Sequence, residues 1–156
     1  MSQARGTDRP RIIVDANVFV SYLLKPDDRG STIHSTVRAA ASDRFELMVP
    51  EKLIAELRRA PDRPKIAGRI PAERVEIFVG GMLDQFGTPA MAPESARSAH
   101  VRDPNDRWYL LEAAIYHDVD ILISGDKHLL ILRGLLDRPR IMSPADFVAE
   151  FGDPAR

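Results

Sequence analysis

Cysteine is absent from the 156-residue sequence, which excludes a disulfide framework, a thiolate metal site and a cysteine nucleophile. The sequence also has no large excess of either charge, because 22 Lys and Arg residues balance 23 Asp and Glu residues and the formal net charge is −1. This balance excludes an all-over basic coat for nucleic acid, although a local basic patch remains open. No apolar run approaches the ~20 residues that a membrane-spanning helix needs. What remains, with 44% hydrophobic and 29% charged residues, is the composition of a globular domain.

The length of the chain suits one domain. We expect a flexible N-terminal tail over residues 1–10, the domain over 11–150 and a C-terminal tail over 151–156. The basic N-terminus leads into an apolar run as in a signal peptide, but Asp15 and Asn17 interrupt the run and no small-residue cleavage site follows. Together with the missing cysteines, this predicts a cytoplasmic protein that does not associate with membranes.

Short apolar stretches alternate with helical patterns along the chain. The apolar stretches are mostly β-branched or aliphatic and are bounded by polar or turn residues, which is typical of buried strands. Their alternation with helices predicts the α/β class, as a three-layer α/β/α sandwich around a central, mostly parallel sheet. The predicted strands are 11–14, 45–49, 121–123 and 140–142, and the predicted helices are 32–41, 50–60, 71–86, 106–117, one after the first strand, a short one after the third and one that begins at Ser143.

Acidic residues stand where the predicted strands end. Asp15 directly follows the first strand, and Asp126 follows the third strand after a Ser-Gly pair. Both therefore belong to the carboxyl edge of the sheet, where open α/β sheets bind their ligands. Asp103 and Asp106 precede the helix that leads into the third strand, and Glu56 lies one turn into the helix after the second. We expect these five acids to converge on one edge.

Converging carboxylates are unfavourable unless they take up protons or hold a cation. The hard divalent ions Mg²⁺ and Mn²⁺ prefer oxygen ligands of this kind. A metal ion held by carboxylates can activate water and stabilise the oxygens of a phosphodiester during hydrolysis. The pattern therefore predicts metal-assisted hydrolysis of a phosphate ester, with the acids serving as ligands.

Each acid also has a plainer explanation when it is taken alone. Asp15 can be a turn and helix-cap residue, Asp106 a helix cap and Asp103 a turn residue. Glu56 has arginines beside it and can be a solvated helix residue, and Asp126 can form a loop ion pair. Only the joint placement of the acids at one sheet edge favours the metal site.

Four stretches of the sequence resemble motifs of the PIN domain family. RIIVDANVFVS at 11–21 is similar to the opening of a PIN domain, and VPEKLIAEL at 49–57 resembles its middle motif. DPND at 103–106 with ILISGDKHLL at 121–130 is similar to the closing half, and SPADF at 143–147 resembles the final helix. The four pieces occur in order over nearly the whole chain. The subfamily that they resemble is that of VapC-like ribonucleases, the toxins of toxin–antitoxin pairs.

The resemblance implies a PIN fold and a ribonuclease that depends on Mg²⁺ or Mn²⁺. The family's first acid falls on Asp15, its second on Glu56 and its fourth on Asp126. The third falls on either Asp106 or Asp103; Asp106 is better placed to open the helix, and Asp103 is then expected to assist. The implied metal ligands are therefore Asp15, Glu56, Asp106 and Asp126.

Polar and basic residues complete the expected site. The resemblance implies that Asn17, Ser21 and Ser124 border it. The segment from Arg58 to Arg69 holds five basic residues against one acid, a net charge of +4, and it follows the helix that carries Glu56. Contacts with RNA phosphates and a merely solvated loop are both open for this segment. The candidate RNA contacts are Arg58, Arg59, Arg63 and Lys65.

The resemblance also implies an RNA substrate, a small antitoxin protein that blocks the site, and homodimers. Two other functions remain open. One is a non-catalytic RNA-binding or assembly module with the same fold. The other is a phosphatase of the haloacid-dehalogenase type, which needs a second aspartate two positions after Asp15, where this sequence has Asn17.

Overall fold

The centre of the fold is a four-stranded parallel sheet. The computed structural model of the chain describes residues 8–87 and 108–152, so Asp103 and Asp106 lie outside the described residues. The sheet has the order β2-β1-β3-β4, and every neighbouring pair is parallel. This confirms the predicted α/β class, with a sheet that is parallel throughout the described residues. The strands are β1 (Arg11–Val14), β2 (Glu46–Leu47), β3 (Ile121–Ile123) and β4 (Arg140–Met142).

The two central strands are apolar from Ile12 in β1 and throughout β3, because helices cover both faces of the sheet. Ile12, Ile13 and Val14 of β1 and Leu122 and Ile123 of β3 have no exposed surface. In the register of the sheet, β1 pairs with β3 residue by residue from Ile12 to Val14. The polar residues that follow β1 and β3 are therefore brought to the same edge of the sheet.

The second strand is shorter than the predicted range 45–49. Phe45 and Val49 are buried but lie outside the two residues that form β2. The Phe45 ring packs instead against Phe147 and Phe151, with ring centroids 5.5 and 5.4 Å apart. At Phe45 and Val49, the apolar character therefore reflects burial in the core rather than strand pairing.

Most of the predicted helices appear within one or two residues of their expected ends. Ser31 and Ser143 accept hydrogen bonds from the backbone N–H groups of His34 and Asp146, as expected of helix N-caps. The helix predicted over 106–117 begins at Trp108 within the described residues. The helices are α1 (Ala16–Leu24), α2 (Thr32–Ala40), α3 (Glu51–Arg59) with the 3₁₀ turn η1 (Ala60–Asp62), α4 (Ala72–Phe86), α6 (Trp108–Tyr116), α7 (Lys127–Leu130) and α8 (Pro144–Phe151).

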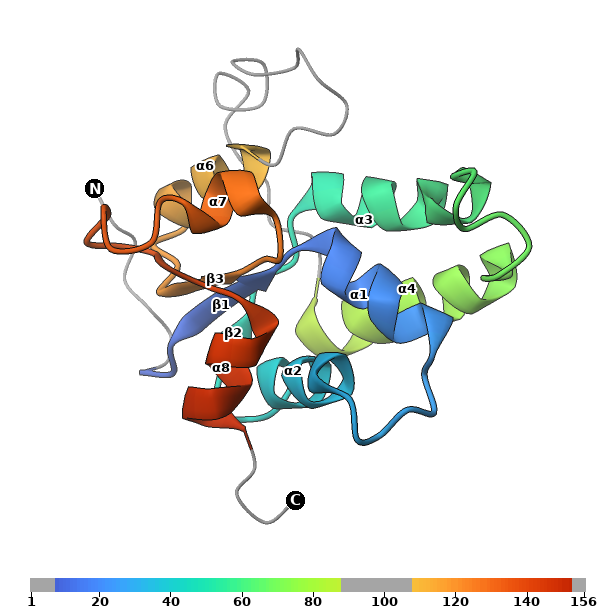
Figure 1. Cartoon of the computed structure of the whole chain (residues 1–156), viewed down its shortest axis with the longest axis horizontal. Coiled ribbons are helices and arrows are strands. Elements are labelled where there is room, and N and C mark those ends of the chain that lie inside the picture. Colours follow the sequence, from blue (N-terminus) through green and yellow to red (C-terminus); the bar gives the residue numbers. More distant parts are fainter. Residues whose placement is uncertain (1–7, 88–107, 153–156) are drawn as a thin grey trace.

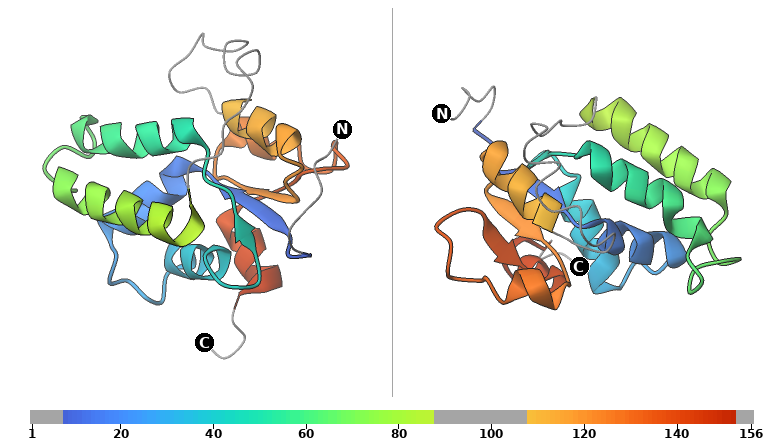
Figure 2. Two further views of the ribbon diagram at one scale, coloured as in Figure 1. Left: turned by 180° about the vertical axis from the view of Figure 1, so that it is seen from behind. Right: turned by 90° about the horizontal axis from the view of Figure 1, so that it is seen from above.

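The helices form layers on the two faces of the sheet. α6 lies on one side of the strands, whereas α2 and α8 lie together on the other side (Figure 1). α1 contacts both α2 and α3, and α3 runs beside α4 away from the sheet (Figure 2). The expected three-layer arrangement is therefore present, and α1 and α3 extend from the edge where β1 ends.

The described residues begin shortly before β1 and end shortly after α8. Arg9 donates hydrogen bonds to the carbonyls of Asp43 and Phe45, and α8 ends at Phe151. The tails over residues 1–10 and 151–156 stay predictions. Among the helices of residues 8–87 and 108–152, none is both long enough and apolar enough to cross a membrane.

Candidate active site

Asp15 stands buried at the carboxyl end of β1. Its backbone N–H donates to the Ile123 carbonyl at 2.9 Å, which extends the pairing of β1 with β3. Its Oδ1 accepts a hydrogen bond from the backbone N–H of Asn17 at 3.1 Å, and its Oδ2 accepts one from the Ser124 hydroxyl at 2.7 Å. Asp15 therefore caps α1, which is the alternative expected for this residue alone. Its carboxylate also contacts Ser124 at the end of the neighbouring strand β3. With only 1% of its surface exposed, the residue depends on such donors to offset its desolvation.

Ser124 joins the two acids that follow the central strands. Its fully buried hydroxyl donates to Asp15 and accepts from the backbone N–H of Asp126 at 3.0 Å. The structure thus brings Asp15 and Asp126 to the same edge of the sheet. Ser124, expected only to border the site, lies between them.

Asp126 differs from Asp15 in its access to solvent. Its side chain is 21% exposed, and its Oδ1 accepts from the backbone N–H of His128 at 2.8 Å, so that it caps α7. The same oxygen lies 3.1 Å from His128 Nδ1. The pair of acids therefore combines one carboxylate inside the fold with one that is partly open to solvent.

Glu56 lies on the buried face of α3, with its side chain only 5% exposed. The alternative that Glu56 is a solvated helix residue is therefore wrong. Arg63 Nη2 stands 3.6 Å from Glu56 Oε2, and Arg63 Nη1 donates to Asn17 Oδ1 at 3.0 Å. Through this guanidinium, the acid on α3 is connected to the first turn of α1, directly after Asp15.

The acids of the described residues do not form a complete metal cage. No three Asp, Glu or His side chains within 8–87 and 108–152 come close enough together to hold a metal ion. The positions expected for the third acid, Asp103 and Asp106, lie outside the described residues. The donor chemistry nevertheless suits a hard divalent ion, because the edge carries carboxylate oxygens and Glu56 already has a cationic guanidinium 3.6 Å away.

The other predicted residues lie at different places around this edge. Asn17 and Ser21 are exposed and four residues apart on α1, so they share one face of that helix. Arg58 pairs with Glu76 of α4 at 3.0 Å, whereas Arg59 and Lys65 are exposed. Of the four candidate RNA contacts, Arg63 is the one that stands against a predicted acid within residues 8–87 and 108–152. The sequence carries no signal for that contact, because it depends on the turn after α3.

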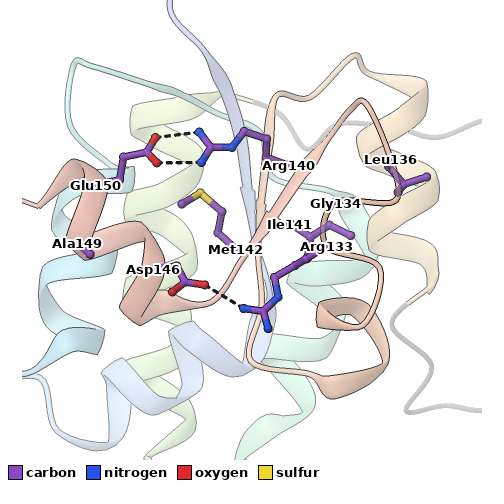
Figure 3. A pocket seen from close by; sticks show the side chains of 9 residues that line it. All are labelled: Arg133, Gly134, Leu136, Arg140, Ile141, Met142, Asp146, Ala149 and Glu150. Carbon is purple, nitrogen blue, oxygen red and sulfur yellow. Dashed lines mark hydrogen bonds and ion pairs between the residues drawn. The ribbon is translucent and has the colours of Figure 1, made fainter.

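A separate hollow of about 580 Å³ lies between β4, α8 and the loop before β4 (Figure 3). Its carboxylates are engaged by arginines: Glu150 accepts two hydrogen bonds of 2.8 Å from Arg140, and Asp146 accepts one of 3.0 Å from Arg133. The Arg140 hydrogen bond lowers the pKa of Glu150 from its ordinary value, and in return the pKa of Arg140 is raised. None of the predicted site residues lines this hollow.

The protein is therefore of the parallel α/β class. It carries two aspartates, Asp15 and Asp126, at the carboxyl ends of its central strands, and the Ser124 hydroxyl connects them. A family model for the PIN domain matches residues 11–128, which is more than half of the chain, and the chain therefore belongs to the PIN domain family. PIN domains are usually nucleases, and they generally use divalent metal ions. Comparison with curated proteins finds no match, and comparison with solved structures finds none either.

Proposed function

We propose that this chain is an endoribonuclease that hydrolyses RNA phosphodiesters with the help of Mg²⁺ or Mn²⁺. The observation that supports it best is the Ser124 hydroxyl, which connects the buried Asp15 carboxylate to Asp126 at the carboxyl edge of the sheet. In a family of nucleases, an ordered pair of acids at that edge suits a hydrolytic site.

The cation would be held by Asp15, Glu56 and Asp126 together with Asp106, and Asp103 would assist. When bound, such an ion activates water and stabilises negative charge on the phosphate. The protein's own contribution is positional. Ser124 orients the Asp15 carboxylate, while the partly exposed Asp126 reaches the solvent side of the site. The exposed polar groups on α1 and the basic residues after α3 would hold the RNA backbone.

The toxin assignment is part of the same proposal. The segments at 11–21, 49–57, 103–130 and 143–147 together resemble VapC-like toxins, so a small antitoxin protein that blocks the site is the expected partner. We propose that the protein acts in the cytoplasm and forms homodimers. Co-expression with the product of a neighbouring short gene, followed by copurification and size-exclusion chromatography, tests both partners. A monomer that retains no small protein would contradict this part of the proposal.

RNA cleavage is the direct test of the proposed chemistry. Structured and unstructured RNA are incubated with the full chain in Mn²⁺ or in EDTA, and wild type is compared with Asp126→Asn. We expect cleavage in Mn²⁺ only, and a loss of about 100-fold or more in Asp126→Asn, because a ligand oxygen and its charge are removed. Asp146→Asn is the matched control, since it changes an exposed aspartate whose carboxylate pairs with Arg133. Cleavage that survives both EDTA and Asp126→Asn would refute the mechanism.

A non-catalytic RNA-binding or assembly module is the second candidate. It is favoured by the finding that no three acids of the described ranges gather into a metal-binding group. This function predicts that RNA is retained without cleavage in Mn²⁺. It also predicts that Asp15→Asn leaves RNA retention unchanged, whereas the nuclease loses its activity with that substitution.

A further inference from the structure

The backbone around Arg63 is fixed by the turn that follows α3. The Arg63 N–H donates to the Ala60 carbonyl at 3.1 Å, and its own carbonyl accepts from Ile66 and Ala67 at 2.9 and 2.8 Å. Ala60 and Ile66 are buried, so the turn is anchored on both sides of Arg63. The position of the Arg63 backbone is therefore fixed by this turn, and the Arg63 side chain extends from it to Glu56 on α3.

The contact between Arg63 and Glu56 is electrostatic rather than a close hydrogen bond. The two charged groups are 3.6 Å apart, whereas charge-assisted hydrogen bonds are about 2.7–2.9 Å long. Arg140 and Glu150 show the tighter arrangement in the same protein, with two contacts of 2.8 Å. The hydrogen bond of the Arg63 guanidinium goes instead to Asn17 at 3.0 Å. The side chain is 35% exposed, so solvent can receive it when it leaves.

Glu56 needs a positive charge close to it. An ionised carboxylate that is 5% exposed has lost most of its hydration, and it is costly unless a counter-charge or donors replace the water. Arg63 supplies one positive charge from the solvent side. A divalent cation at the same carboxylate would supply two, and it would repel a guanidinium that stayed within a few ångströms.

We propose that Arg63 is the resident counter-ion of Glu56 and competes with the divalent cation for this carboxylate. Binding of the cation then releases the guanidinium to the rim beside Asn17, where it is free to contact an RNA phosphate. Metal affinity without RNA is therefore lower than the acids alone would allow. This inference rests on the proposed metal-dependent function, and it assigns Arg63 a role in regulating that site.

Mn²⁺ affinity of the full chain without RNA, measured by titration calorimetry, tests the competition. We expect Arg63→Gln to bind Mn²⁺ about tenfold more tightly than wild type, because one repelling charge beside the ion is lost. Arg63→Lys keeps the charge and should bind within about threefold of wild type. Arg69→Gln is the matched control, since it removes an exposed arginine of the same loop and should change the affinity by less than about twofold.

A second pair of variants shows whether the effect passes through Glu56. In the Glu56→Gln background, the gain from Arg63→Gln should fall below about threefold, because the contested carboxylate is gone. Thermal unfolding gives an independent readout. Without metal, Arg63→Gln should unfold at a lower temperature than wild type, and saturating Mn²⁺ should raise its midpoint by more than it raises that of wild type.

The outcomes separate this inference from the function on which it rests. Equal Mn²⁺ affinity in wild type and Arg63→Gln, or an equal gain with and without Glu56, would overturn the role of Arg63 and leave the nuclease intact. Absence of Mn²⁺ binding in both proteins, together with absence of RNA cleavage, would overturn the proposed function and the competition with it.

Discussion

Removing the Ser124 hydroxyl is the sharpest test of how the sheet edge is built. Ser124→Ala deletes the donor to Asp15 Oδ2 and the acceptor for the Asp126 N–H in one step. The fully buried position admits no water in place of the hydroxyl without rearrangement. The substitution therefore removes the hydrogen-bonded connection between Asp15 and Asp126 while both carboxylates are retained.

The size of the effect follows from these two contacts. A hydrogen bond to a charged group contributes about 1.5–3 kcal/mol to stability, and a neutral one about 1 kcal/mol. We therefore expect Ser124→Ala to lower the free energy of unfolding by about 3 kcal/mol. Since domains of this kind have about 5–15 kcal/mol in total, the variant should still fold. Cleavage of RNA should fall by about 10–100-fold, as is typical when a residue that orients a metal ligand is lost.

Urea unfolding and RNA cleavage in Mn²⁺, measured on the same preparations, check both numbers. Ser31→Ala is the matched control because Ser31 is a helix N-cap on another element, α2, where it accepts from the His34 N–H at 3.0 Å. It should cost about 1 kcal/mol of stability and leave the cleavage rate unchanged. Ser124→Thr retains a hydroxyl and should keep more activity than Ser124→Ala. Full activity in Ser124→Ala, or a loss of activity equal to that of Ser31→Ala, would refute the reasoning.

Two further predictions concern the core and the pH dependence of stability. Phe147→Ala should lower the free energy of unfolding in urea by about 3–5 kcal/mol, because its buried ring packs against Phe45 and Phe151; a loss below about 1 kcal/mol would contradict this packing. Burial, and then the charge of Arg11, lower the pKa of His117 from its ordinary value of about 6.5. As the pH falls, His117 therefore takes up a proton in the unfolded chain before it does so in the folded chain. The free energy of unfolding is unaffected by this group above about pH 6.5 and decreases as the pH falls below that value. Denaturant midpoints between pH 7.5 and 5.5 should show this fall, and His117→Asn should reduce it; an unchanged slope in the variant would exclude His117 as its source.

Much of the fold is predictable because local patterns and the core agree. β3 and the last three residues of β1 are continuous apolar stretches, and such stretches are buried in any sheet that has helices on both faces. Ser143-Pro144 is a helix start that depends on neighbouring backbone alone, and α8 begins there. The second strand is less predictable, since Phe45 looks the same in sequence whether it pairs with a strand or packs against α8.

The acidic edge is predictable in part. Parallel strands end at the same side of a sheet, so the positions of Asp15 and Asp126 after β1 and β3 already imply that they are neighbours. Sequence patterns do not give the distance between two side chains, and they do not show which third group forms hydrogen bonds to both residues. Ser124 was expected at the border of the site, and only the fold places its hydroxyl between the two acids.

The amino-acid sequence alone determined the class of fold, the edge that carries the acids and the family resemblance, because each depends on residue type and local order. The tertiary structure decided which groups neutralise the buried carboxylates. Whether Glu56 faces solvent or the core, and whether Arg63 stands beside it, depends on how α3 packs against α1 and how the chain turns after it. Such contacts join residues on different elements, and their energies depend on distance and burial, which the order of residues does not specify.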